Sequence, residues 1–242
     1  MSFALCRSLP ELPKNAGQMI WQQKLDGVRA FVSPDSIRLR GSLLKNTGLI
    51  VPEGCVLDGE IMSDKFFNVM PAINRQDWGS LQFVPFDVVK ADGEDVRGQN
   101  LLERLVLLNS LTDNALPSFA FPGQKMPKVP KDWEGVIGKS VVSPYRSGRS
   151  WVKWKHVGYV DAVILGYEPG RGGWSDGIGK VVFGTADGTV LGKAAGFDRQ
   201  TRKFLSLNGV DYIGKPCVIQ HYGVNKKRLR NPIFHGIKEE IQ

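Results

Sequence analysis

The sequence alternates short runs of strand-forming residues with glycine, proline and Asp-Gly turns, and this pattern constrains the fold more than any other feature. Runs rich in β-branched and aromatic residues that end at turn residues predict β-strands. We therefore expect a sheet-rich protein. The predicted strands cover residues 28–33, 37–40, 55–62, 82–89, 135–142, 151–155, 160–167, 180–184, 189–193 and 217–222.

The sequence predicts few helices. The stretch NLLERLVLLNSL has a helical stripe of leucines behind a capping Asn100, and a weaker helix is expected at 66–75. Strands with a few helices against them indicate an α+β fold for the first part. After His156 the chain has short strands, many glycines and no long helix expected, which predicts a small closed barrel. We place one domain at 1–157 and a second at 158–242.

The net charge, the apolar runs and the cysteines limit which partners and which bound metals the sequence supports. The formal net charge of +8 favours a polyanion such as nucleic acid, although many proteins are equally basic without binding one. No apolar run has the length of a membrane span, and residues 1–20 lack the apolar core of a signal peptide. We therefore expect a cytoplasmic protein with no membrane partner. The three cysteines are far apart and form no C-x-x-C pair, which argues against a disulfide framework and against a zinc site.

The stretch KLDGVR at 24–29 combines residues that are poor strand formers. One interpretation is a solvated hairpin, because Asp-Gly is a common tight-turn pair. The other is that Lys24 is a nucleophile, with Gln22, Lys24 and Asp26 on one face of an extended segment. A lysine amine attacks phosphorus only when it is deprotonated. Burial and a nearby cation, either Arg29 or a metal ion, would lower its pKa.

Further stretches supply charged groups in a fixed order along the chain. These are CVLDGEIM, FVPFDVV, WEGVIGKS and SWVKWKH, and the last places two lysines on one strand face with Trp154 on the other. Each alone is compatible with a turn, a core residue or a solvated strand. Together they could hold a nucleoside triphosphate and its metal ion. The residues concerned are Glu60, Phe86, Glu134, Lys139, Lys153 and Lys155.

In this order the stretches resemble the motifs of the covalent nucleotidyltransferases, and among them the small ATP-dependent DNA ligases of the bacteriophage type. The resemblance implies an adenylation domain of antiparallel sheets with flanking helices, followed by an OB-fold barrel. It also implies that Lys24 takes the AMP, that Glu60 serves the ribose and the metal, and that Phe86 stacks on adenine.

The resemblance extends to phosphate, metal and DNA contacts. It implies that Arg29 helps to bind the nucleotide, and that Glu134 joins Glu60 in holding Mg²⁺. Arg40, in preference to Arg38, would face the 5′-phosphate of the nick. Residues 228–234, RLRNPIF, resemble the first part of the family's last motif, but the residues that follow differ from the usual end of that motif. The remaining implied contacts are Lys139, Lys153 and Lys155 to the phosphates of ATP, Arg230 and Lys238 to pyrophosphate, and Lys226, Lys227 and Arg228 to DNA.

The function implied is sealing of nicks in double-stranded DNA by a monomer that uses ATP and Mg²⁺. ATP is favoured over NAD because few residues precede Lys24 and a zinc-cysteine cluster is absent from the sequence. One alternative is an RNA ligase or an mRNA-capping guanylyltransferase, although Glu134-Gly135 stands where capping enzymes tend to have Asp-Gly. The other is a non-catalytic nucleic-acid-binding module, against which intact Lys24, Glu60 and Glu134 argue.

Overall fold

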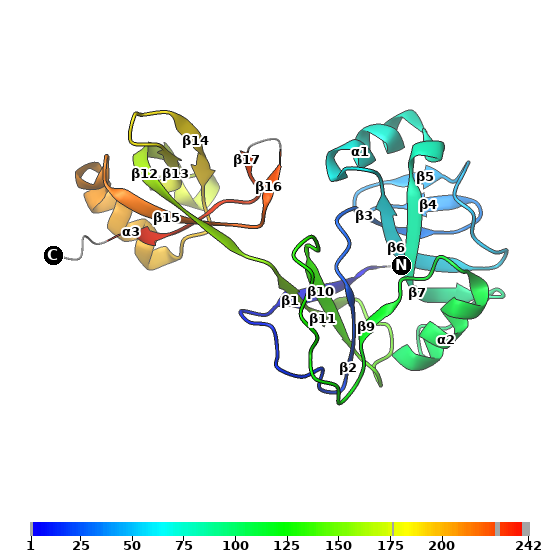
Figure 1. The fold of residues 1–242 in the computed structure, drawn as a ribbon. Coiled ribbons are helices and arrows are strands. Elements are labelled where there is room, and N and C mark those ends of the chain that lie inside the picture. Colours follow the sequence, from blue (N-terminus) through cyan, green and yellow to red (C-terminus); the bar gives the residue numbers. More distant parts are fainter. Residues whose placement is uncertain (1, 176, 226–227, 239–242) are drawn as a thin grey trace. The chain divides into compact units, whose positions relative to one another are not determined.

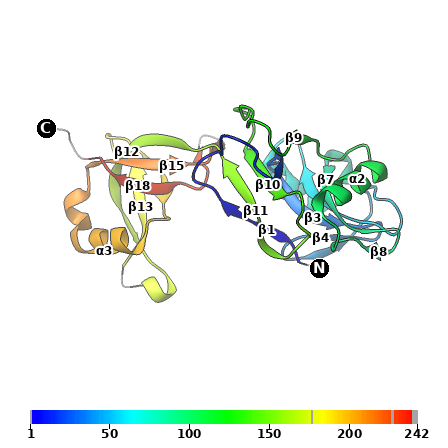
Figure 2. The ribbon, with the colours of Figure 1, turned by 90° about the horizontal axis from the view of Figure 1, so that it is seen from below.

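The computed structural model describes residues 2–175, 177–225 and 228–238, and the chain divides into two compact units. Unit 1 is Met1–Lys155 and unit 2 is His156–Gln242 (Figures 1 and 2). The division falls two residues before the expected boundary between 157 and 158. Within the described residues, no helix combines the length and the apolar character that crossing a membrane requires.

Unit 1 contains two sheets. The first has the order β5-β4-β3-β6-β7-β8 and is antiparallel throughout. The second has the order β1-β11-β10-β2-β9, in which only β1 and β11 run parallel. The strands are β1 Ala4–Ser8, β2 Met19–Gln23, β3 Val28–Val32, β4 Ser36–Arg38, β5 Leu43–Lys45, β6 Val56–Met62, β7 Gln82–Ala91, β8 Glu94–Asp95, β9 Ser118–Ala120, β10 Gly135–Ser140 and β11 Gly148–Lys155.

The helices of unit 1 lie where the sequence predicts them, at α1 Phe66–Arg75 and α2 Leu101–Leu111. The Asn100 side chain accepts a hydrogen bond from the backbone N–H of Glu103 at 3.0 Å, and the Glu103 carboxylate accepts one from the Asn100 N–H at 2.9 Å. This capping box fixes the start of α2 because it satisfies two backbone donors that have no partner in the helix. Leucines of α2 then pack into the core of the first sheet.

A second buried cluster joins the two sheets of unit 1 and supports the site described below. Phe31 of β3 and Phe86 of β7 come from the first sheet, whereas Ala4 of β1 and Trp151 of β11 come from the second. Tyr145 packs edge-on against Trp151 with ring centroids 5.8 Å apart. Aromatic burial of this kind holds the facing ends of the two sheets in place.

Unit 2 is built on one antiparallel sheet with the order β14-β13-β12-β15-β18. Its two edge strands also meet, because Ala195, directly after β14, forms a parallel bridge with Ile233 of β18. The Phe234 N–H donates to the Ala195 carbonyl at 3.0 Å at this point. The strands are β12 Gly158–Pro169, β13 Ile178–Gly184, β14 Val190–Ala194, β15 Pro216–His221 and β18 Ile233–Ile237, with a separate pair β16 Val224–Asn225 and β17 Arg228–Leu229.

Helix α3, Arg199–Asn208, corrects the expectation that no long helix follows His156. Its only buried residue is Leu205, and its apolar residues Phe204, Leu205 and Leu207 all lie in the last turn, so no apolar residue recurs over successive turns. The helix is nevertheless capped, because the Asp198 carboxylate accepts a hydrogen bond from the Thr201 N–H at 2.7 Å. The extended segment expected around Gln22 overlaps β2, but the sequence did not predict the short strands β1, β5, β8, β9, β16, β17 and β18.

Candidate active site

A pocket of about 250 Å³ opens in unit 1 between the two sheets. Its wall is made by residues from strands that are far apart in sequence, and most of its charged side chains are basic. The lining residues are Leu5, Cys6, Gln22, Gln23, Lys24, Leu25, Arg29, Arg40, Glu60, Phe86, Leu116, Ile137, Lys139, Trp151, Lys153 and Lys155.

Lys24 directly follows β2 and is held beside β10, because its N–H donates to the Gly135 carbonyl at 2.9 Å. Its Nζ lies 2.5 Å from Oε2 of Glu134. The other oxygen of the same carboxylate, Oε1, lies 2.5 Å from Nζ of Lys155. The side chains of Lys24 and Glu134 are 19% and 10% exposed. One carboxylate therefore holds two lysines at the mouth of the pocket.

The chain between β2 and β3 is not a hairpin, because the two strands belong to different sheets. The hairpin interpretation of Asp-Gly is therefore wrong. Gly27 is required by a close approach instead: a Cβ at this position would lie 2.3 Å from the Ile61 carbonyl oxygen. Since β2 ends at Gln23, strand alternation does not continue to Asp26, and the consecutive residues Gln22, Gln23 and Lys24 all line the pocket.

Arg29, on β3, forms part of the wall but its charge is balanced. Its Nε and Nη2 donate to the two oxygens of the fully buried Asp58 at 2.9 and 2.5 Å. The Tyr145 hydroxyl donates to the same carboxylate at 2.6 Å, and the guanidinium lies 4.6 Å from the centroid of the Trp151 ring. Arg29, which the sequence suggested as a cation that lowers the pKa of Lys24, is therefore paired with Asp58. The side chain that contacts Lys24 directly is that of Glu134.

Glu60 lies on β6 in register with Arg29 and faces the pocket. Burial raises its pKa from 4.5 to about 7, because the ionised carboxylate loses hydration, and the charges of Lys24 and Arg29 offset this only in part. This carboxylate therefore changes charge near neutral pH.

Phe86 contributes a mostly buried ring, which is 6% exposed and packs edge-on against Trp151 with centroids 6.0 Å apart. Behind it, the buried Lys139 donates to the Phe86 carbonyl at 2.8 Å and lies 3.7 Å from the Asp87 carboxylate. Burial lowers the pKa of Lys139 to about 8. Asp87 is also bound by Arg104 at 2.8 Å, so this buried carboxylate has two cationic partners.

The two lysines of β11 that the sequence predicts on one strand face, Lys153 and Lys155, both line the pocket. Trp154 packs instead in a separate apolar cluster of unit 1. Burial and the neighbouring charge of Lys155 lower the pKa of Lys153. Arg40 is exposed and completes the basic side of the pocket.

Gln22 is a pocket residue to which the sequence reading gave no role. Its side chain is 1% exposed, and Nε2 donates to the Leu116 carbonyl at 3.0 Å. Its Oε1 is the only buried side-chain polar atom without a hydrogen-bond partner among the described residues. Such an atom costs stability unless a ligand satisfies it. Its place two residues before Lys24 is visible in the sequence, but its burial is not.

The predicted residues near the end of the chain belong to unit 2. Arg228 is exposed on β17, and Arg230 follows it at the start of a turn in which Asn231 has a φ of 46°. Lys238 pairs with Asp161 at 2.7 Å. Lys226 and Lys227 lie outside the described residues.

Within the described residues, no group of three or more histidine, cysteine, aspartate or glutamate side chains gathers as a metal centre. The three cysteines are free: Cys6 lines the pocket, and Cys55 and Cys217 are buried.

The chain was compared with known proteins to find the family to which it belongs. No protein-family model matches the chain. The multifunctional non-homologous end joining protein LigD of Mycobacterium bovis is 31% identical over 195 residues, which are 70% of this chain and 26% of that protein. The SPbeta prophage-derived DNA ligase-like protein LigB of Bacillus subtilis is 26% identical over 190 residues, 67% of this chain and 70% of that protein. The chain belongs to the DNA ligase family.

This DNA ligase family member spans about a quarter of the length of the LigD proteins that it matches. Its fold is that of a Lig E DNA ligase studied for DNA binding with a minimal scaffold. The TM-score is 0.76 at 21% identity, with 98% of this chain and 99% of the other covered.

Proposed function

We propose that the protein is an ATP-dependent DNA ligase whose unit 1 is the adenylation domain. The observation that carries this proposal is the pocket in which Lys24, Glu60, Lys139, Lys153 and Lys155 converge from three strands and one strand end. A nucleophilic lysine, a carboxylate and several cations are the groups that transfer of a nucleotidyl group requires. Membership of the DNA ligase family supports the same reading.

Lys24 is the proposed nucleophile. Its Nζ, as the free amine, attacks the α-phosphorus of ATP, the bond to the pyrophosphate oxygen breaks, and pyrophosphate leaves. The resulting AMP passes to the 5′-phosphate of a nick, and the 3′-hydroxyl then displaces it. Before the first step Lys24 must give up a proton. The carboxylate of Glu134 already accepts a hydrogen bond from its Nζ and is the group placed to take part in that transfer.

The base end of the pocket fits adenine. The unpaired Oε1 of Gln22 is an acceptor, and the exocyclic amino group of adenine is a donor. Guanine carries a carbonyl oxygen at the corresponding position, which would leave two acceptors facing one another. The Phe86 side chain, which lines the pocket, would supply an apolar contact for the adenine ring. This acceptor favours ATP over GTP and therefore a ligase over a capping enzyme.

The phosphate end is cationic, with Arg40, Lys139, Lys153 and Lys155 lining the pocket. Mg²⁺ is commonly held by one or two carboxylates together with substrate phosphates, and Glu60 and Glu134 are the carboxylates that fit this role. When bound, the ion would neutralise phosphate charge. The protein groups orient the triphosphate and stabilise the charge that develops on it.

Unit 2 is proposed to be an OB-fold barrel. Five antiparallel strands whose edges meet at Ala195 and Ile233 support this proposal, because such a bridge closes a sheet upon itself. Its basic residues Lys226, Lys227 and Arg228 would contact nicked duplex DNA. Arg230 and Lys238 would assist pyrophosphate departure. A monomeric state and a cytoplasmic location remain predictions.

Intact mass spectrometry tests the proposal. After incubation with ATP and Mg²⁺, the wild type is expected to gain the mass of AMP, and Lys24→Ala is expected to gain none. Lys14→Ala, an exposed lysine of the same unit outside the pocket, is the matched control and should gain AMP. Sealing of a nicked duplex by the wild type completes the test. A wild-type protein that forms no adduct with ATP contradicts the proposal, and a GMP adduct after a parallel incubation with GTP and Mg²⁺ would favour a capping enzyme.

A further inference from the structure

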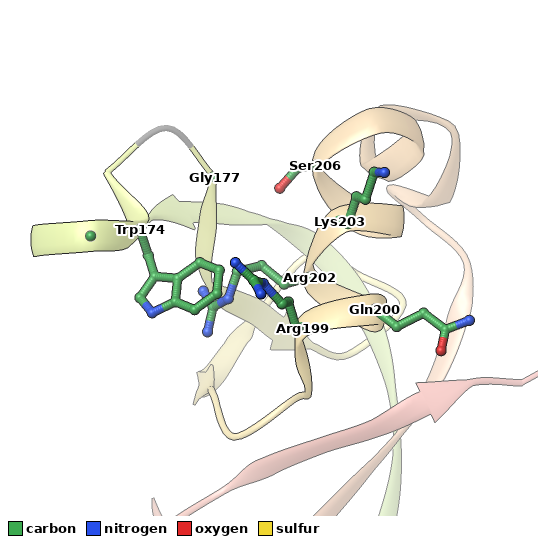
Figure 3. A pocket seen from close by; sticks show the side chains of 8 residues that line it. Trp174, Gly177, Arg199, Gln200, Arg202, Lys203 and Ser206 are labelled. Atoms are coloured by element: carbon green, nitrogen blue, oxygen red, sulfur yellow. The ribbon is translucent and has the colours of Figure 1, made fainter.

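Unit 2 contains a second pocket, of about 660 Å³, that is lined by residues with no part in the function proposed above (Figure 3). One side is the short 3₁₀ helix Gly172–Trp174 in the connection between β12 and β13, and the other is α3. The lining side chains with aromatic or polar groups are Trp174, Arg199, Gln200, Arg202, Lys203 and Ser206.

An indole and two guanidiniums form the centre of this pocket. The Cζ atoms of Arg202 and Arg199 lie 4.8 and 5.6 Å from the centroid of the Trp174 ring. Arg202 also lies 4.8 Å from the Phe197 ring and donates to the Ile178 carbonyl, so its position is fixed. Figure 3 shows both arginine side chains directed from α3 toward the indole. Trp174 nevertheless remains 45% exposed.

The other polar groups of the pocket are also able to donate hydrogen bonds. Lys203 and Gln200 are exposed on α3. The Ser206 oxygen accepts from the Ile178 N–H at 3.1 Å, which leaves its hydroxyl hydrogen available. No carboxylate lines the pocket within the described part of unit 2. In the adjoining hollow beside Trp174, Glu168 is already paired with Lys193 and Lys180.

A pocket with three cations, several donors and a large exposed aromatic ring suits an anion that carries flat apolar groups. A polynucleotide strand has this chemistry, because phosphates bind Arg and Lys while bases stack on tryptophan. The bases of a duplex are already stacked on one another, so an exposed indole selects for an unpaired base.

We propose that this pocket binds a single-stranded segment of DNA, with an unpaired base against Trp174 and phosphates on Arg199 and Lys203. The proposal rests on DNA being the substrate of this chain, and it adds a preference that the sealing of a simple nick does not require. It predicts that the protein holds DNA ends with overhangs or flaps more tightly than blunt ends.

The test uses the full chain and two fluorescent probes, an oligothymidylate of about 12 nucleotides and a blunt duplex of similar charge, in anisotropy titrations. Trp174→Ala is expected to weaken binding of the oligothymidylate about 5- to 150-fold and to change duplex binding much less. Lys203→Ala should lower the slope of log affinity against log salt by about 0.7. Lys215→Ala, an exposed lysine of unit 2 outside the pocket, is the matched control.

Trp174→Phe keeps an aromatic ring and should retain most of the affinity, which separates stacking from a loss of folding. Unchanged binding of the oligothymidylate by Trp174→Ala overturns the proposal. An equal loss for both probes overturns it in favour of a duplex contact. The AMP adduct of the wild type is measured in parallel. If the adduct forms and the oligothymidylate result is negative, only this proposal fails. If no adduct forms, the proposed function fails independently.

Discussion

Replacement of Glu60 by glutamine tests the electrostatics of the active-site pocket directly. The pKa of Glu60 is about 7 in the folded protein and 4.5 in the free side chain. A raised carboxyl pKa means that the folded state binds the proton more tightly than the unfolded state. The resulting stability is fully present below pH 4.5 and is lost as the pH rises through 7.

The size of the effect follows from these two values. The difference between about 7 and 4.5, at 1.36 kcal/mol for each pKa unit, corresponds to about 3 kcal/mol. The wild type should therefore lose about 3 kcal/mol of unfolding free energy from this group between acid and pH 8.5. Glu60→Gln carries no titrating carboxyl and should lose none. The stability of the variant relative to the wild type is thus expected to rise by about 3 kcal/mol over that range.

Urea unfolding followed by tryptophan fluorescence measures this difference. All tryptophans except Trp174 lie in unit 1, so a Trp174→Phe background makes the signal specific to that unit. Glu53→Gln, which removes an exposed carboxylate of unit 1, is the matched control. A variant-minus-wild-type difference that stays flat from pH 4.5 to 8.5 would refute the reasoning, because Glu60 would then titrate alike in both states.

Three further predictions concern stability and reaction steps. Arg104→Met should lower the unfolding free energy of unit 1 by about 3–5 kcal/mol, measured by urea unfolding, because it removes a partner of the buried Asp87. Phe86→Ala should cost about 3 kcal/mol of stability and also weaken ATP binding; calorimetry that finds unchanged ATP affinity would make Phe86 a core residue only. Arg230→Ala or Lys238→Ala should slow formation of the AMP adduct more than sealing of a pre-adenylylated nick, and equal slowing in both assays would argue against a role at pyrophosphate.

The sequence alone determined the sheet-rich character of the protein and its two principal helices in unit 1. These features depend on short-range patterns: turn residues end the strands, and the Asn100 capping box starts α2. The order of the charged stretches likewise indicated the lysines and Glu60 of the pocket, together with Glu134, which contacts two of those lysines. Local patterns did not reveal α3, because its apolar residues are confined to its last turn and do not repeat along the helix.

Only the tertiary structure decided how these residues are paired. Sequence spacing cannot show that Glu134, 110 positions from Lys24, binds both that lysine and Lys155, because sheet topology brings them together. It also cannot show that Arg29 is committed to Asp58, or that Gln22 is buried with one oxygen unpaired. Burial and pairing set the charge and the free hydrogen-bonding capacity of each group, and both arise only when distant strands pack.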